Sequence, residues 1–222
     1  MSTSKTSETY KTLKSSLLNG EFAPGAQLRI DAIRQSLDVS IGAVREALSR
    51  LTSDGLVENM PQRGFVVAPI SADDLCDLTN ARIEVEVRCL ALAIERGDLD
   101  WEGRILSAYH QLSRTELQSG QAGGTINAAW TELHAHFHDS LIAACGSPWR
   151  LKLRDMMFMQ AERYRRMTAP DTAGHRDLDA EHKAIMEATL DRDAPKACAL
   201  LARHFEITLE MVLNSGVLVE RM

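Results

Sequence analysis

The stretch HAHFHDS, residues 134–140, places three of the chain's seven histidines within five positions. If residues 125–145 form one helix, His134 and His138 lie four residues apart and share a face, whereas His136 points elsewhere. Two imidazoles at this spacing often begin a metal site. A stable site needs at least one more ligand from another element, because two histidines alone bind a metal weakly.

His182 and His204 are the candidates for the further ligands. They lie in the amphipathic stretches EHKAIMEATL and CALLARHFEITLEMV, near positions that we expect to face the interior of a helical bundle. A buried imidazole needs a polar partner or a metal, since burial without one is costly. Two other interpretations stay open at this point: ordinary core or surface histidines, and imidazoles that bind a carboxylate directly without a metal. We expect the remaining three on the surface, namely His110, His136 and His175.

A metal-dependent hydrolase is an alternative to a binding protein, because a bound metal can activate water. The histidine cluster lacks the helical glutamate of an HExxH motif, and the sequence contains no glycine-rich phosphate loop or nucleophile elbow. We therefore expect that the protein is not an enzyme.

The composition is typical of a soluble globular protein, with 45% hydrophobic and 25% charged residues among 222. No apolar run reaches the length of about 18 residues that a membrane span requires, and the polar start MSTSKTSETYKTLKSS does not resemble a signal peptide. The four cysteines lie far apart, which indicates reduced thiols. These features predict a cytoplasmic protein with no membrane partner.

The charge is uneven along the chain and suggests two domains. Residues 1–69 hold eight Lys and Arg against seven Asp and Glu, leaving 17 against 24 for the rest of the chain. Such an asymmetry indicates two parts with different partners. We place the boundary between residues 69 and 70.

The first 69 residues predict a winged helix-turn-helix. Two short helical patterns flank the Pro-Gly turn of FAPGAQL, and a third helix begins after Ser40 and ends near Gly55. The segment LVENMPQRGFVVAPI then predicts a β-hairpin.

From Ser71 onward the pattern predicts an all-α, antiparallel helical bundle, so that the whole chain is mainly α. The expected helices lie at about 71–97, 99–118, 125–145, 148–168, 174–190 and 194–213.

Several motifs resemble the GntR superfamily of bacterial transcription factors, and more narrowly its FadR subfamily with an FCD effector domain. They are LLNGEFAPGAQL, VSIGAVREALSRLTSDGLVENMPQRGFVV, FHDSLIAACGSPWRL and EHKAIMEATLDRD, and together they extend over most of the chain. The resemblance implies a homodimeric regulator, with repression expected, that binds a double-stranded DNA operator. It also implies that a small carboxylate in the bundle controls this binding.

The start of the recognition helix and the wing are the expected DNA contacts. Arg45 can bond guanine bidentately, and the wing turn QRG lets the backbone and Arg63 approach the minor groove. Ile41-Gly42-Ala43 replaces the Arg-Thr-Pro of many relatives, so the operator sequence cannot be copied from them. The full expected set is Ser40, Arg45, Arg63, Gly64, Arg50, Arg29 and Lys11.

The resemblance also supplies a metal site. In many FCD domains an aspartate and a histidine four residues apart meet two further histidines around one divalent ion. Here His138, His182 and His204 match the histidines, and His134 stands where the aspartate usually is. Nitrogen ligands favour Zn²⁺ or Ni²⁺. Four neutral ligands would leave the ion's charge uncompensated, which should attract an anion.

Three residues are candidates for effector binding: Arg82, Tyr164 and Arg165. Arg82 matches a pocket arginine of the family, although an intrahelical pair with Glu86 is the alternative. The H..FH, CGS and ERYR stretches also resemble a branch of repressors of glutarate and 4-aminobutyrate catabolism, which favours a dicarboxylate. A regulator that senses the metal ion itself remains a second possibility.

Overall fold

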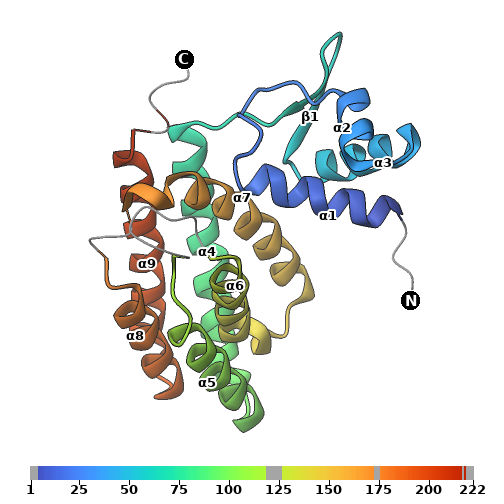
Figure 1. Ribbon diagram of the computed structural model, residues 1–222. Helices are drawn as coiled ribbons and strands as arrows, with labels where there is room; N and C mark the ends of the chain where they lie inside the picture. Colours follow the sequence, from blue (N-terminus) through green and yellow to red (C-terminus); the bar gives the residue numbers. More distant parts are fainter. Residues whose placement is uncertain (1–4, 119–126, 173–175, 217, 219–222) are drawn as a thin grey trace. The chain divides into compact units, whose positions relative to one another are not determined.

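The computed structural model describes residues 5–118, 127–172, 176–216 and 218 (Figure 1). The chain divides into two compact units. One comprises Met1–Ser71 with Glu162–Met167, and the other comprises Ala72–Ala161 with Thr168–Met222. No described helix is long and apolar enough to cross a membrane.

The first unit is a winged helix-turn-helix, as the sequence predicts. Its elements are α1 (Lys5–Leu18), α2 (Ile30–Leu37), α3 (Ile41–Ser53), β1 (Val57–Met60) and β2 (Gly64–Val67). Ser40 caps α3, because its side chain accepts a hydrogen bond from the backbone N–H of Ala43 at 3.2 Å. One apolar stripe of α3 is fully buried and consists of Val44, Leu48 and Leu51.

The wing is an antiparallel hairpin in which Val57 lies opposite Val67 and Met60 opposite Gly64. The backbone of Gln62 and Gly64 has positive φ angles of 65° and 70°. This conformation favours glycine and explains why the turn can close tightly beside Arg63.

The second unit is built from helices: α4 (Ala72–Arg96), α5 (Leu99–Ser113), α6 (Ala128–Ile142), the 3₁₀ turn η1 (Ala143–Cys145), α8 (Leu178–Leu190) and α9 (Ala194–Asn214). It also holds most of α7 (Pro148–Thr172), whose residues 162–167 belong to the first unit. Aspartate side chains cap the starts of three helices and accept hydrogen bonds from backbone N–H groups; they are Asp98, Asp177 and Asp193.

The prediction for α5 was too long, since the helix ends at Ser113 and not near residue 118. Beyond it the backbone N–H of Thr115 bonds the carbonyl of Leu112, and the N–H of Asn127 bonds the carbonyl of Leu117. The chain thus leaves the helix in turns rather than continuing it. The expected starts of two further helices, near residues 125 and 174, lie outside the described residues, as does His175.

A continuous core fixes α6, which carries the first histidine pair. Trp101 on α5 is fully buried, and its indole N–H donates to the carbonyl of Ser140 at 2.9 Å. Phe137 and Leu141 of α6 are also fully buried. Helix α5 packs on α6, and α9 packs on both α4 and α8. The four cysteines are reduced thiols, as the sequence predicts.

Candidate functional site

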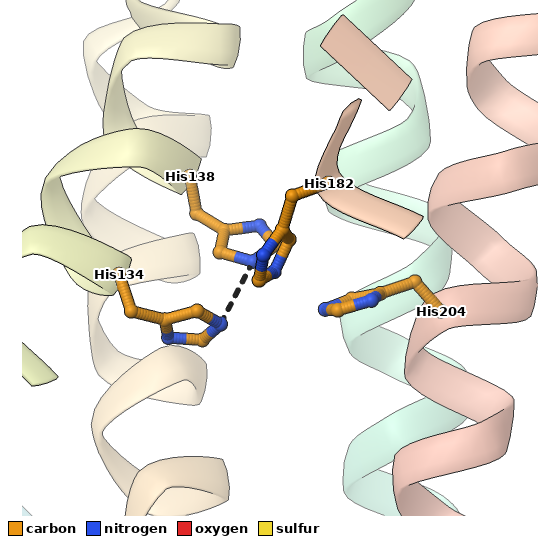
Figure 2. Close-up of side chains that lie close together, drawn as sticks. All are labelled: His134, His138, His182 and His204. Carbon is orange, nitrogen blue, oxygen red and sulfur yellow. Dashed lines mark hydrogen bonds between the residues drawn. The ribbon is translucent and has the colours of Figure 1, made fainter. Parts of the chain in front are cut away.

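Four histidines from three helices converge inside the second unit (Figure 2). One nitrogen atom of each side chain lies within 4.8 Å of the corresponding atoms of the other three. The set combines the pair on α6 with one residue each from α8 and α9. The four residues are His134, His138, His182 and His204, and each is only 1–5% exposed.

The spacing on α6 accounts for the first pair. Positions four apart share a helix face, and the imidazole rings of His134 and His138 have centroids 4.6 Å apart. Their Nε2 atoms approach to 3.2 Å. Trp130 stacks on His134 with a centroid distance of 4.6 Å and so restrains that ring from the previous turn. His136 and His110 are exposed, as predicted.

The chemistry of this donor set fits a divalent metal ion. Burial, and then the neighbouring imidazoles, lower the pKa of His138 well below its usual range, so this ring is neutral and offers a lone pair. Its Nδ1 is buried and has no hydrogen-bond partner among the described residues. Metal–nitrogen bonds of about 2.1 Å place the ligands of a tetrahedral site about 3.4 Å apart. The four nitrogen atoms, which lie within 4.8 Å of one another, are near this spacing.

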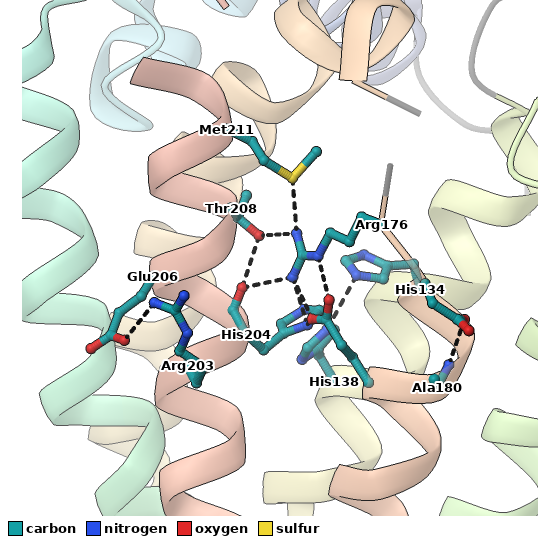
Figure 3. A network of polar contacts seen from close by, with 11 residues as sticks. His134, His138, Arg176, Ala180, Arg203, His204, Glu206, Thr208 and Met211 are labelled. Atoms are coloured by element: carbon teal, nitrogen blue, oxygen red, sulfur yellow. Dashed lines mark hydrogen bonds and ion pairs between the residues drawn. The ribbon is translucent and has the colours of Figure 1, made fainter. Parts of the chain in front are cut away.

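A second layer of polar side chains holds His204 (Figure 3). Its Nδ1 lies 2.8 Å from a carboxylate oxygen of Glu181. The same Nδ1 lies 3.0 Å from Nη2 of Arg176, a group that only donates. With its proton on Nδ1 the imidazole donates to Glu181, and Nε2 keeps a lone pair for a metal. This carboxylate–imidazole arrangement is the one that fixes the orientation of histidine ligands in metal sites.

Arg176 in turn holds Glu181. The guanidinium donates to both carboxylate oxygens at 2.6 Å and also bonds the backbone carbonyl of His204 and the hydroxyl of Thr208, each at 2.8 Å. Burial alone raises the pKa of Glu181, but the hydrogen bonds from Arg176 and His204 outweigh it and lower the pKa to about 2. Burial also lowers the pKa of His204. The sequence did not predict a role for Arg176 or Glu181, although Glu181 directly precedes His182.

Arg82 pairs with Glu86 on the same helix, which is the alternative that the sequence left open for it. Its Nε donates to a carboxylate oxygen of Glu86 at 2.5 Å. The guanidinium also lies over two aromatic rings, 4.0 Å from the centroid of Phe205 and 5.0 Å from that of Phe158. The Phe205 ring lies 5.7 Å from the ring of His204. Arg82 and His204 therefore both lie against the Phe205 ring.

The other two effector candidates belong to the first unit. The hydroxyl of Tyr164 bonds the backbone N–H and carbonyl of Ser71 at 3.3 and 3.4 Å. Arg165 donates to both carboxylate oxygens of Glu162 at 2.6 and 2.7 Å.

Four of the predicted DNA contacts line one cleft of about 560 Å³ in the first unit: Arg29, Arg45, Arg63 and Gly64. The three arginines are exposed, and among the described residues no carboxylate lines the cleft. Such a basic surface suits the phosphates and base edges of a duplex. Gln27, Ser49 and Asn59 also line it and were missed. Ser49 could have been found, since it lies four residues after Arg45 on the same helix face.

The remaining three predicted contacts lie outside this cleft. Ser40 is the N-cap of α3, and Lys11 is exposed on α1. The guanidinium of Arg50 lies over the ring of Tyr10 at 4.1 Å. Tyr10 itself donates to Asp54 at 2.5 Å. Arg50 thus helps to join α1 and α3, in addition to any contact with DNA.

Comparison with known proteins agrees with this architecture. Residues 5–67 match the family described as bacterial regulatory proteins, gntR family, and residues 77–207 match the FCD domain. The chain is 36% identical over 210 residues to the HTH-type transcriptional regulator BphR of Paraburkholderia xenovorans (strain LB400), a match that covers 95% of this chain and 86% of that relative.

A second relative is the HTH-type transcriptional repressor GlaR of Escherichia coli (strain K12), with 33% identity over 199 residues, 88% of this chain and 90% of the relative. The fold is similar to that of E. coli McbR/YncC, with a TM-score of 0.76 and 20% identity over 96% of this chain and 98% of the other. The two sequence relatives, BphR and GlaR, are named as transcriptional regulators. The chain therefore belongs to the GntR family, in the FadR-like subfamily with a C-terminal FCD domain, and is a DNA-binding transcriptional regulator.

Proposed function

We propose that this regulator is a homodimeric repressor whose operator affinity is controlled by a small carboxylate, and preferably a dicarboxylate. In this proposal residues 1–69 bind the operator, and residues 70–222 bind the effector and dimerise. The effector binds beside a divalent ion, Zn²⁺ or Ni²⁺, that the four histidines hold. The buried imidazole cluster is the observation that carries the proposal.

The residues present explain why a metal and an anion would bind together. The ion, when bound, supplies a positive centre that attracts a carboxylate. All four histidine ligands are neutral, and the nearby carboxylate of Glu181 is already paired with Arg176. The chain therefore does not cancel the charge of the ion, and an anionic effector can do so. Imidazole nitrogens favour Zn²⁺ or Ni²⁺ over Mg²⁺ or Ca²⁺.

The helices that hold the histidines also give the effector a means to act on the fold. The cluster joins α6, α8 and α9, so an anion that changes its geometry changes how three helices pack. Arg82 and His204 both contact the ring of Phe205, and in this proposal Arg82 and the histidine cluster form the effector surface.

An exposed apolar stripe on α7 supports the dimer. Trp149, Leu153 and Met156 are 74%, 45% and 49% exposed and follow a spacing of four and three residues. A helix face of this kind usually marks a contact with another protein. A second copy is the expected partner, because one winged helix reads too few bases for a specific operator.

Fluorescence anisotropy tests the proposal with an operator selected from random duplexes by the protein itself. We expect succinate, glutarate or adipate to lower operator affinity at least tenfold in zinc-loaded protein, and to have no effect after EDTA treatment or in His182→Ala. His136→Ala, an exposed histidine of α6, is the matched control. DNA affinity that follows Zn²⁺ without any acid would favour the second function, a metal-responsive regulator. Affinity that responds to neither would contradict both.

A further inference from the structure

A second charged cluster lies buried in the second unit, beside the histidines but not part of them. It consists of Arg82 and Glu86 on α4 and Arg154 on α7, whose side chains are 11%, 1% and 2% exposed. Neither Glu86 nor Arg154 was expected from the sequence to take part in a site. Burial of three ionisable side chains is costly and calls for an explanation.

The guanidinium of Arg154 is only partly satisfied. Its Nη1 donates to Asp139, and the Asp155 carboxylate lies 3.4 Å away. Its Nε lies 3.4 Å from Glu86 without a hydrogen bond. Both Nε and Nη2 are buried and have no hydrogen-bond partner among the described residues. Together, Nε and Nη2 form one edge of the guanidinium, the edge that binds a carboxylate through two parallel hydrogen bonds.

The carboxylates around Arg154 leave one edge of its guanidinium unbonded. Asp139 and Asp155, whose side chains are 54% and 70% exposed, both contact Nη1. The buried Nε and Nη2 therefore keep two N–H donors for an incoming acceptor. Glu86 accepts a hydrogen bond from Arg82 Nε at its Oε1, 2.5 Å away, while its Oε2 lies 3.4 Å from Arg154 Nε without a hydrogen bond.

The position of the cluster connects it with the histidines. The guanidinium groups of Arg82 and Arg154 lie 5.0 and 4.3 Å from the centroid of the Phe158 ring. That ring lies 6.5 Å from the ring of His134 and 6.4 Å from the ring of His138. The Phe158 ring is thus flanked by both cations and by the first histidine pair.

We infer that the Nε–Nη2 edge of Arg154 is a second carboxylate site, which binds the far carboxylate of a short dicarboxylate whose near carboxylate lies at the histidines. This inference rests on the proposed function, because it assigns the second half of the same effector. Arg154 then determines specificity: a dicarboxylate uses both sites, and a monocarboxylate of the same length leaves the arginine edge unsatisfied. Glu86 sets the strength of the site, since its negative charge competes with the incoming carboxylate.

Isothermal titration calorimetry of the zinc-loaded full chain with glutarate and with pentanoate tests this inference. We expect wild type to bind glutarate more tightly than pentanoate. Arg154→Lys keeps the charge but loses the bidentate edge, so glutarate affinity should fall at least tenfold while pentanoate affinity stays the same. Arg203→Lys, an exposed arginine on α9, should change neither. Glu86→Gln removes the competing charge and should tighten glutarate binding about threefold or more.

The outcomes separate the inference from the proposed function. If wild type binds neither acid, the proposed function fails and the inference fails with it. If Arg154→Lys binds glutarate as tightly as wild type, or weakens both acids equally, the function stands and the inference is wrong. If Arg154→Lys does not fold, Glu86→Gln decides, and unchanged glutarate affinity in that variant overturns the inference. Sulfate binding as tight as glutarate binding would overturn the assignment to dicarboxylates.

Discussion

Replacement of Glu181 by glutamine tests whether the second layer of the histidine cluster serves a metal. The carboxylate of Glu181 accepts from His204 Nδ1 at 2.8 Å and from Arg176 through both oxygens at 2.6 Å. Glutamine keeps one oxygen acceptor and the side-chain size but loses the charge. We expect His204 to remain in place as a weaker ligand.

The magnitude follows from the role of this contact. Loss of such an outer partner typically weakens metal binding by about 10- to 100-fold, which corresponds to about 1.4–2.7 kcal/mol. Since Glu181 holds only one of four ligands, the lower half of this range is expected for Glu181→Gln. Glu181→Ala should reach the upper half, because it also removes the acceptor for Nδ1–H and leaves Arg176 without its carboxylate.

Competition for Zn²⁺ against a chromophoric chelator measures this affinity without DNA or an effector. Glu187→Gln is the matched control, because Glu187 lies on the same helix and is exposed beside Lys183. Equal zinc affinities for Glu181→Gln and Glu187→Gln would refute the reasoning and leave the Arg176–Glu181–His204 contacts a purely structural device. A thermal melt of each variant shows whether the fold is retained.

Three further predictions concern the fold, the dimer and the DNA surface. Arg45→Ala should cost about 1–3 kcal/mol of specific operator binding, measured at fixed salt, whereas the exposed Arg104→Ala on α5 should cost nothing; equal affinities would remove Arg45 from the interface. Trp149→Glu should convert a dimer to a monomer in light scattering, and the exposed Leu99→Glu should not; a Trp149→Glu dimer would place the interface elsewhere. Trp101→Phe removes the buried N–H that donates to the Ser140 carbonyl of α6. It should lower the free energy of unfolding, measured by urea denaturation, by about 1–3 kcal/mol. An unchanged free energy of unfolding would show that this hydrogen bond does not stabilise the fold.

The sequence was most informative where local rules apply. Ser40 as an N-cap and the apolar stripe from Val44 to Leu51 follow from helix geometry, and the structure confirms both. The i, i+4 spacing of His134 and His138 likewise predicts a shared face. The convergence of His182 and His204 on that pair joins segments more than forty residues apart and was predicted from the family resemblance together with their amphipathic helices.

The contacts that the sequence did not predict are tertiary and polar. Arg154 approaches Glu86 across 68 positions, and no spacing rule connects α4 with α7. Arg176 was missed because it lies in a short segment before α8, where the pattern of apolar residues gives no orientation. The end of α5 was placed too late, since the polar residues after Ser113 are compatible with either a helix or a turn. In the structure the choice between helix and turn is made by two hydrogen bonds, from Thr115 N–H to the Leu112 carbonyl and from Asn127 N–H to the Leu117 carbonyl.

Anomalous diffraction at the zinc edge, from crystals grown with one equivalent of Zn²⁺ per chain, tests the central claim most directly. We predict one anomalous peak at the centre of the cluster, about 2.1 Å from one nitrogen each of His134, His138, His182 and His204. The same crystals grown from His182→Ala should lack it. An empty cluster in the wild-type crystals, or a peak bound only to residues outside these four, would contradict the claim that the cluster is a metal site.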